Sequence, residues 1–361
     1  MRGAALALGL GAALCIAGGG FGVPALYVPG IALALLGAAS AALVHVAARE
    51  ARILRALGAE VIEEQAALPI ALSLTRSRLP LAGNEARAWP GGPVLALPDS
   101  TTVRVETSVS FARRGRHRLG PASLVIADPL GLCSRTLEST PDEVIVVPRV
   151  EPLRFSVADG AGAPDGRAAG ASLVGDVQES EVDGLQPHQP GTPASRIHWP
   201  AVARSTTLME RRMVADGGHS ALVVVDPRGA SSVDALDRAV RAAASLCVHL
   251  ARGGGCVLLL PGDRRPLVID PSLSGFGQAQ VRLALLEPQA GGPPVAATSG
   301  SRAVLWVTAA EGRVRELESL RAAVRYLVSP HARARWPVQF TVAGCSGQLL
   351  AHRGAARAVV V

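Results

Sequence analysis

The sequence contains no lysine: all 36 basic residues are arginine, and against 29 acidic residues they give a net charge of +7. Aromatic residues make up only 3% of the 361 residues. Nucleic-acid-binding domains usually gather basic side chains in one stripe, with aromatic side chains for stacking. Here the arginines form no long run and no aromatic-interleaved strip, so the composition argues against nucleic acid as the partner.

Paired cysteines are also lacking. The chain has five, an odd number, and no two of them have the spacing of a metal site: Cys15, Cys133, Cys247, Cys256 and Cys345. Most of them stand in apolar runs, where a cysteine behaves as a small hydrophobic residue. This pattern argues against a disulfide framework and favours a reducing compartment.

Charge is missing altogether between Arg2 and Arg49. A membrane-spanning helix needs about 20 apolar residues to cross about 30 Å of hydrocarbon. Two such helices are expected, one from Gly3 to Gly18 and one from Ala25 to Ala48, because a Gly/Pro-rich turn separates them. Small residues on both segments would let the helices approach closely: Gly9, Gly11, Ala12, Gly37, Ala38 and Ala41.

The arginines that flank the two segments predict their orientation. Arg2 precedes the first helix, and Arg49, Arg52 and Arg55 follow the second, while the connecting turn has no positive charge. The positive-inside tendency therefore places both termini in the cytoplasm, in a multi-pass protein of the cell membrane. An alternative is a cleaved signal peptide in an exported cell-surface protein. A second uncharged segment directly after the first disfavours it.

The remaining chain divides into segments of different pattern. Residues 49–66 have helical spacing and predict a juxtamembrane helix, and residues 67–150 contain alternating β-branched runs typical of a β-sandwich. Residues 151–180 are rich in Gly and Ala and are interpreted as a linker. Residues 181–361 hold a motif region and an α/β domain.

In that last part, apolar strands alternate with amphipathic helices. Strands are expected at 221–225, 257–260, 303–307 and 338–342, and helices at 233–252, 277–286 and 313–328. The first strand is apolar throughout, as in parallel sheets that are covered on both faces. The alternation predicts an open, Rossmann-like α/β sheet with helices on both faces.

Two blocks of sequence resemble a known family. One runs from Arg113 to Pro121 and continues as Ala127-Asp128-Pro129-Leu130-Gly131-Leu132; the other contains Leu185, Gly191, His198, Trp199 and Arg204. In this order, between a pair of hydrophobic helices and an α/β domain, they are similar to the bacterial family called domain of unknown function 58. The resemblance covers essentially the whole chain.

The resemblance implies a membrane-anchored protein with a von Willebrand A-like α/β domain and no established reaction. It also implies a protein partner, because such members are often encoded beside MoxR-type AAA+ ATPases and are thought to interact with them or to serve in cell-envelope processes. No cofactor and no small-molecule substrate follow from the sequence.

A metal site is the sharpest chemical question. Metal-binding von Willebrand A domains place Asp-x-Ser-x-Ser after their first strand, where carboxylate and hydroxyl oxygens surround a hard cation. Here the turn reads Asp226-Pro227-Arg228-Gly229-Ala230, so arginine and alanine replace the hydroxyls. We expect a degenerate site with no metal. A metal-dependent binding module remains the alternative.

Catalytic residues are not apparent. His188 and His198 have no Cys, Asp or Glu between them to complete a zinc site, and the turn at Gly344-Cys345-Ser346-Gly347 lacks the spacing of a nucleophile elbow. The candidates for an interaction surface are Arg196, His198, Trp199, Arg204, Arg211 and Arg212, since arginine and tryptophan are enriched at binding hot spots. A core position for Trp199, with solvated arginines around it, is the competing interpretation. The sequence thus predicts a non-enzymatic, membrane-anchored interaction scaffold.

Overall fold

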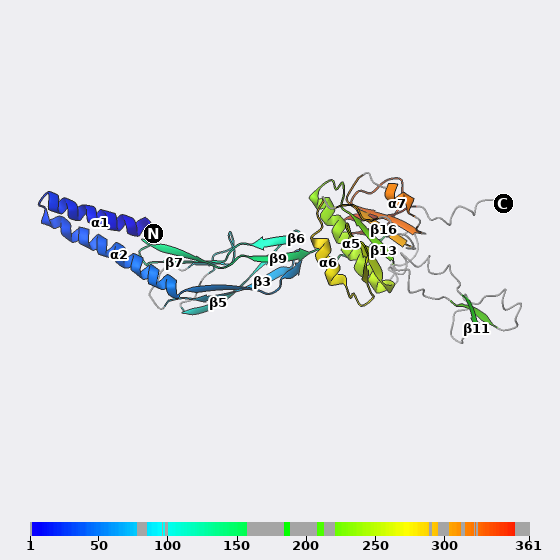
Figure 1. Cartoon of the computed structure of the whole chain (residues 1–361), viewed down its shortest axis with the longest axis horizontal. Helices are drawn as coiled ribbons and strands as arrows, with labels where there is room; N and C mark the ends of the chain where they lie inside the picture. The colour runs from blue at the N-terminus through cyan, green and yellow to red at the C-terminus, as the bar shows by residue number, and fades with distance from the viewer. Residues whose placement is uncertain are drawn as a thin grey trace. The chain divides into compact units, whose positions relative to one another are not determined.

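The structure is a computed structural model that describes residues 2–77, 85–95, 97, 100–156, 184–187, 208–212, 221–288, 291–294, 303–311, 315–320, 322 and 324–350. The chain forms two compact units (Figure 1). The first comprises Met1–Ala112 and Arg116–Val146, and the second comprises Arg113–Gly115 and Val147–Val361. The division therefore falls a few residues before the boundary at 150 that the sequence predicted.

The first unit begins with two apolar helices. They are α1 (Arg2–Gly20) and α2 (Tyr27–Glu50), joined by a short 3-10 helix, η1 (Pro24–Leu26). Each is long and apolar enough to cross a membrane, as the sequence predicted. Large side chains such as Leu6, Ile16 and Val28 are at least 70% exposed on the outer surfaces of the helices. An apolar exterior of this kind suits a lipid environment.

Glycines let these two helices pack closely. A Cβ atom on Gly11 would lie 2.6 Å from the carbonyl oxygen of Gly30, and one on Gly37 would lie 2.9 Å from that of Ala4. Neither approach is possible for a larger residue without moving a backbone. Gly9 differs from the expectation, because a Cβ there would have nothing within 4 Å. Only some of the small residues therefore form the helix contact.

The helix predicted for residues 49–66 is wrong. After Glu50 the backbone becomes extended at Ala51, and two strands follow, β1 (Arg52–Leu57) and β2 (Val61–Glu63). The strand period was hidden because a charged residue, Arg55, points inward. Its side chain is 1% exposed, and its guanidinium binds Asp142 and donates to the carbonyls of Ala88 and Gly120. An inward arginine breaks the apolar alternation that marks a strand.

The predicted β-rich region is present, with its strands distributed over three three-stranded sheets in place of the simple sandwich expected. One sheet has the order β1-β3-β5, one β2-β9-β6 and one β4-β7-β8. They share a single hydrophobic core that also includes Val44 and Ala47 of α2. The further strands are β3 (Ala67–Thr75), β4 (Glu85–Arg87), β5 (Thr102–Ser110), β6 (Gly115–Leu119), β7 (Ser123–Ala127), β8 (Ser134–Glu138) and β9 (Asp142–Val147).

A buried carboxylate organises the turn between β7 and β8. Asp128 is 4% exposed and accepts hydrogen bonds from the backbone N–H groups of Leu130 and Cys133. Burial opposes ionisation of this group. These bonds outweigh that effect and hold the pKa of Asp128 below its usual value. The second half of the first signature block therefore stabilises a turn.

The second unit is built on a mixed eight-stranded sheet of order β10-β18-β19-β17-β16-β13-β14-β15. Strands β14, β13, β16 and β17 are parallel, and the others pair antiparallel. The elements are β10 (Arg154–Phe155), β13 (Ala221–Asp226), α5 (Val233–Gly254), β14 (Cys256–Leu259), β15 (Leu267–Ile269), α6 (Phe276–Ala284), β16 (Ala303–Thr308), α7 (Arg315–Ser319), β17 (Val324–Ser329), β18 (Val338–Val342) and β19 (Cys345–Leu349).

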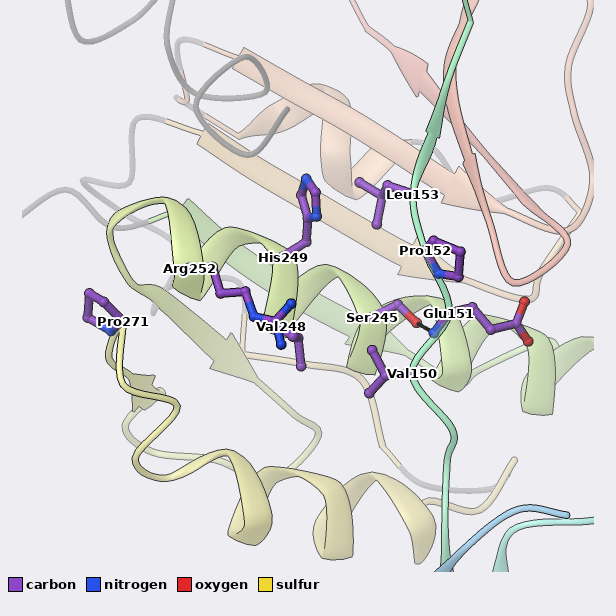
Figure 2. A pocket seen from close by; sticks show the side chains of 9 residues that line it. All are labelled: Val150, Glu151, Pro152, Leu153, Ser245, Val248, His249, Arg252 and Pro271. Carbon is purple, nitrogen blue, oxygen red and sulfur yellow. Dashed lines mark hydrogen bonds between the residues drawn. The ribbon is translucent and has the colours of Figure 1, made fainter. Parts of the chain in front are cut away.

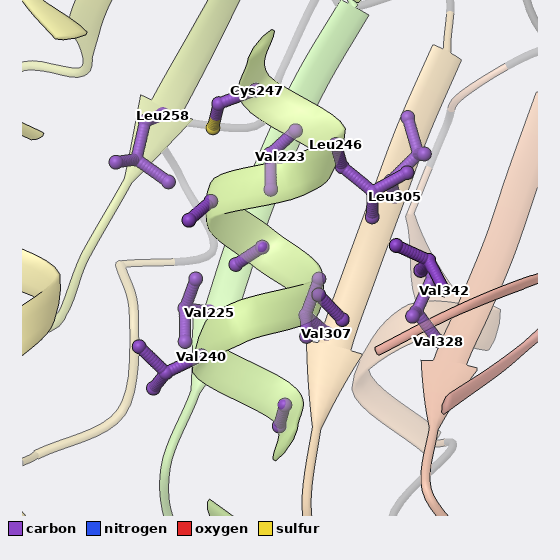
Figure 3. Packing of buried hydrophobic residues seen from close by; sticks show 14 of the residues in the cluster. Val223, Val225, Val240, Leu246, Cys247, Leu258, Leu305, Val307, Val328 and Val342 are labelled. Carbon is purple, nitrogen blue, oxygen red and sulfur yellow. The ribbon is translucent and has the colours of Figure 1, made fainter. Parts of the chain in front are cut away.

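Helices cover both faces of this sheet, as predicted for the α/β region. Val223 and Val225 of β13 pack in one cluster with α5 (Figure 3). Leu222 and Val224, which point the other way, pack in a second cluster with Leu317 of α7. Alternate residues of one strand thus enter different cores, which explains why the strand is apolar throughout.

Two other expectations for the second unit are wrong. A helix was predicted for residues 313–328, whereas α7 covers only Arg315–Ser319 and Val324–Ser329 is strand β17. Strand β17 is buried between β16 and β19, so tertiary packing overrides the local helical spacing. The predicted linker 151–180 includes β10, which pairs with β18; its residues 157–180 lie outside the described part of the chain.

The first half of the signature block also has a structural role. Arg114 is 9% exposed, and its guanidinium pairs with Asp237 of α5 at 2.9 Å. It also donates to the carbonyls of Leu283 and Ala284 at the end of α6, where a cation is favourable. Arg113 binds Asp234 and Asp237 on the same helix. This turn therefore groups with the second unit.

The helix contact gives a testable prediction. We expect Gly11→Leu to destabilise the full chain in detergent micelles by about 1–3 kcal/mol, because the new side chain would overlap the backbone of α2. Gly9→Leu, two residues away on the open surface, is the matched control and is expected to leave stability unchanged. The measurement is unfolding in a titration with sodium dodecyl sulfate. Equal effects of the two substitutions would contradict this packing.

Candidate functional site

The candidate site lies where the strand order of the second unit changes direction. From β13 the chain crosses through α5 to β14 on one side, and later enters β16 on the other side of β13. In open α/β sheets, ligands bind at the carboxyl ends of the strands flanking such a switch point. Asp226 ends β13 and Thr308 ends β16, and the two are paired in the parallel register. Their loops therefore define the site.

Arg228, two residues further along the same turn, binds the Asp226 carboxylate at this point. The Asp226 side chain is 0% exposed, and each of its oxygens accepts a bond of 2.8 Å from Arg228, one from Nε and one from Nη2. The backbone N–H of Arg228 donates to the same carboxylate. This bidentate pair is the geometry in which arginine binds carboxylates most strongly. It fills the sides of Asp226 from which a cation would approach.

The surroundings hold the guanidinium in place. Arg228 Nη2 lies 3.4 Å from Glu316 of α7, and a Cβ on Gly292 would fall 2.4 Å from the guanidinium carbon. A larger residue at position 292 would therefore push the Arg228 guanidinium out of this position. Hydrogen bonding to Asp226 raises the pKa of Arg228, so the guanidinium stays charged at any physiological pH. Gly229, with φ +67°, allows the turn that brings Arg228 back.

A second group of polar side chains lies in the following loops. Ser231 Oγ is 3.1 Å from Nε2 of His331, and the same nitrogen is 3.8 Å from Glu311. A catalytic triad requires the acid on the opposite ring nitrogen, where it orients the base. Here both contacts use Nε2, so this trio does not have that geometry. Ser232 instead caps α5, because its side chain accepts a hydrogen bond from the backbone N–H of Ala235.

An arginine–tryptophan cluster follows β17, and the sequence pattern did not single it out. The guanidinium carbons of Arg333 and Arg335 lie 5.8 and 5.7 Å from the ring centre of Trp336, within the range of a cation–π contact. Arg333 also donates to the carbonyl of Glu311. Burial lowers the pKa of Arg333. The spacing Arg-x-Arg-Trp was the available signal for this cluster.

The structure describes only part of the predicted interaction surface. Arg196, His198, Trp199 and Arg204 lie outside the described residues, as does His188. Arg211 and Arg212 stand in β12 (Met209–Arg212), which pairs antiparallel with β11 (Gly184–Pro187). This pairing joins Leu185, which begins the second signature block, to Arg211.

The cysteine turn near the end of the chain does not have the properties of a reactive site. Cys345 is 1% exposed, and burial raises the pKa of its thiol to about 12. A thiol in that state is a poor nucleophile. All five cysteines are free. Among the described residues, no group of three or more His, Cys, Asp or Glu side chains is placed to hold a metal ion.

The internal ion pair leads to a testable prediction. We expect Arg228→Ala to destabilise the full chain by about 3–5 kcal/mol, because it leaves a buried carboxylate without its partner. The double variant Asp226→Asn/Arg228→Ala removes the charge as well and should recover much of that loss. The measurement is thermal unfolding with and without Mg²⁺. A wild-type chain that Mg²⁺ stabilises would show that the ion displaces Arg228 and would contradict the assignment.

No protein-family model, no curated protein and no solved structure matches this chain. The site is therefore defined by its own geometry: a buried carboxylate that carries a tethered guanidinium at the switch point of an α/β sheet.

Proposed function

We propose that this protein is a non-enzymatic, membrane-anchored interaction scaffold of the type found in the domain of unknown function 58 family. The observation that carries the proposal is the bidentate pair of Asp226 with Arg228. In a metal-binding von Willebrand A domain, an oxygen of the ligand completes the coordination of the ion at this position. Here Arg228 binds the Asp226 carboxylate in place of an ion, so recognition falls to the surrounding protein surface.

The strand order supports the von Willebrand A-like part of this proposal. Numbered from β13 in chain order, the strands β15-β14-β13-β16-β17 run 3-2-1-4-5, the order of a doubly wound fold. The antiparallel edge strand β15 fits the same scheme. The first signature block is compatible with the family assignment, since Arg114 and Asp128 both have specific partners in the fold.

The proposed partner is a protein with an acidic surface, and a MoxR-type AAA+ ATPase is the first candidate. Arg333, Arg335 and Trp336 combine positive charge with an aromatic side chain, which is the composition of interface hot spots. Arg204 and Arg211 belong to the surface that the sequence indicates. A role in cell-envelope processes is compatible with the same contacts.

Co-purification tests the partner. The full chain, extracted in mild detergent from cells that also express the MoxR-type ATPase of the same genome, should retain that ATPase. Arg335→Glu, and Arg204→Glu combined with Arg211→Glu, should each reduce its recovery at least about tenfold, as loss of a hot spot does. Arg265→Glu, an exposed position in the same unit, is the matched control. Recovery that none of these reversals changes would contradict the proposed surface.

We expect both termini on the cytoplasmic side, and reporter fusions can check this topology. Green fluorescent protein at the carboxyl end should fluoresce, and alkaline phosphatase at the same position should be inactive, because phosphatase matures only after export. The opposite pattern, with cleavage near Gly20, would favour the exported cell-surface alternative. The metal-dependent alternative is addressed separately by the response of the Asp226 site to Mg²⁺.

A further inference from the structure

The turn between β7 and β8 is attached to the first residues of α1. The backbone N–H of Ala4 donates a hydrogen bond of 2.8 Å to the carbonyl oxygen of Leu132. A Cβ atom on Gly3 would lie 2.7 Å from the same oxygen, so the helix and the turn are in direct contact. The first N–H groups of a helix have no partner within the helix, and this turn supplies one. Figure 1 shows β7 beside the start of α1.

The length of α1 places its first turn at the edge of the hydrocarbon. The apolar part of the helix runs from Gly3 to Gly20 and has 18 residues. At about 1.5 Å per residue these span about 27 Å, slightly less than the hydrocarbon thickness of about 30 Å. A spanning helix of this length has no excess residues, so Ala4 lies at the lipid surface. The carbonyl of Leu132, which is bonded to Ala4, lies at the same level.

The packing of α2 indicates the same level. A Cβ atom on Gly37 of α2 would lie 2.9 Å from the carbonyl oxygen of Ala4, so Gly37 is beside the first turn of α1. Val44 and Ala47, about two and three turns further along α2, are buried in one core with the strands. The neighbour of α2 thus changes from α1 to the strands just beyond Gly37. The folded body begins at the level where α1 begins.

Leu130 stands at the tip of the attached turn, and its side chain is 61% exposed. Gly131 beside it is exposed too, and a Cβ atom there would have nothing within 4 Å. Internal hydrogen bonds hold the turn in shape: the N–H of Gly131 donates to the carbonyl of Asp128, and the N–H of Leu130 donates to the Asp128 carboxylate. A fixed turn therefore presents a large apolar side chain at its open tip.

The tip lies close to the lipid surface. Leu130 is two residues from Leu132, so their Cα atoms are at most about 7 Å apart. The headgroup zone on each side of the hydrocarbon is about 5–8 Å thick. Leu130 is therefore within reach of this zone, where an apolar side chain can leave water for the lipid.

Exposure alone does not mark such a position. Val150 of the second unit is 38% exposed, but it lines a cavity of about 860 Å³ beside α5 together with Leu153 and Val248 (Figure 2). Its apolar neighbours in that lining shield it in part from bulk water. Leu130 instead stands on an open turn, and a bilayer is the surface at hand to cover it.

We propose that the turn between β7 and β8 is a membrane contact, with the side chain of Leu130 inserted into the lipid interface beside α1. The occupant is the lipid bilayer, because the turn continues the apolar exterior that Leu6 and Leu10 form on α1. The contact adds a third attachment to the two helices and restricts the tilt of the first unit against the membrane plane. The inference rests on the membrane anchor proposed above.

Quenching by spin-labelled lipids tests the contact in the full chain, reconstituted in phosphatidylcholine nanodiscs. A fluorophore on Leu130→Cys should lose most of its emission when the lipid carries a nitroxide near the headgroup end of its acyl chain. Val61→Cys, an exposed position in β2, is the matched control and should keep its emission. Figure 1 shows β6 and β9, which form one sheet with β2, at the end of the first unit opposite to α1. The wild-type chain, labelled in the same way, measures the background from Cys15.

Failure of the anchor and failure of the contact give different results. Leu10→Cys, an exposed position on α1, should be quenched by lipids that carry the nitroxide deep in the acyl chain. Quenching at position 10 without quenching at position 130 overturns the contact and leaves the anchor intact. Absence of quenching at both positions overturns the anchor and the contact with it.

Reaction with a charged, water-soluble maleimide gives a second readout that needs no apolar dye. The thiol of Leu130→Cys should react more slowly in nanodiscs than that of Val61→Cys, each rate being divided by the rate after unfolding, because lipid excludes the reagent. Leu130 is exposed, so its substitution leaves the core intact, and thermal unfolding verifies this. Equal rates overturn the contact. A protected thiol that lipids do not quench shows that a second copy or another protein covers Leu130, and this result overturns the lipid assignment.

Discussion

Buried arginine–carboxylate pairs are the interaction on which both units depend. Arg55 with Asp142 joins strands of different sheets in the first unit, while Arg114 with Asp237 and Arg228 with Asp226 hold loops in the second. Each guanidinium also reaches a second acceptor, a carbonyl or another carboxylate. A lysine ammonium is a point charge without this planar fork. Arginine, the only basic residue type in this chain apart from histidine, is therefore better suited to such positions. At least one partner of each pair is buried, and removing the other would leave its charge uncompensated and out of water.

Buried ion pairs and hydrogen bonds also give the first signature block a structural role. Short stretches rich in arginine and aspartate are easily interpreted as chemical or binding motifs. In this chain, Arg114 bonds the end of α6 and Asp128 closes the turn between β7 and β8. Both residues are nearly buried, so neither is available to a partner. Residues that keep a fold intact do not by themselves indicate its function.

The sequence predicted those helices and strands whose apolar pattern matches their surroundings in the fold. The uncharged helices and the all-apolar strand β13 follow directly from hydropathy and period. Errors arose where tertiary contacts override the local pattern: Arg55 points inward from β1, and β17 is a buried strand with helical spacing. At the site, Asp226 was recognised from its turn. The direction of the Arg228 side chain was not predictable, because it depends on Glu316 and Gly292, each more than 60 residues away.

A tethered cation also has a consequence for regulation. A metal ion equilibrates with its surroundings, so a metal-dependent domain changes charge and shape with the concentration of the ion. Arg228 is part of the chain and cannot leave the site as an ion does, and its raised pKa keeps the guanidinium charged. The switch point of the sheet therefore always holds a cation. Any control of binding at this edge must act through groups that are accessible to solvent. His331 and Glu311 meet that requirement, since they lie in the same loops and their side chains are 34% and 69% exposed.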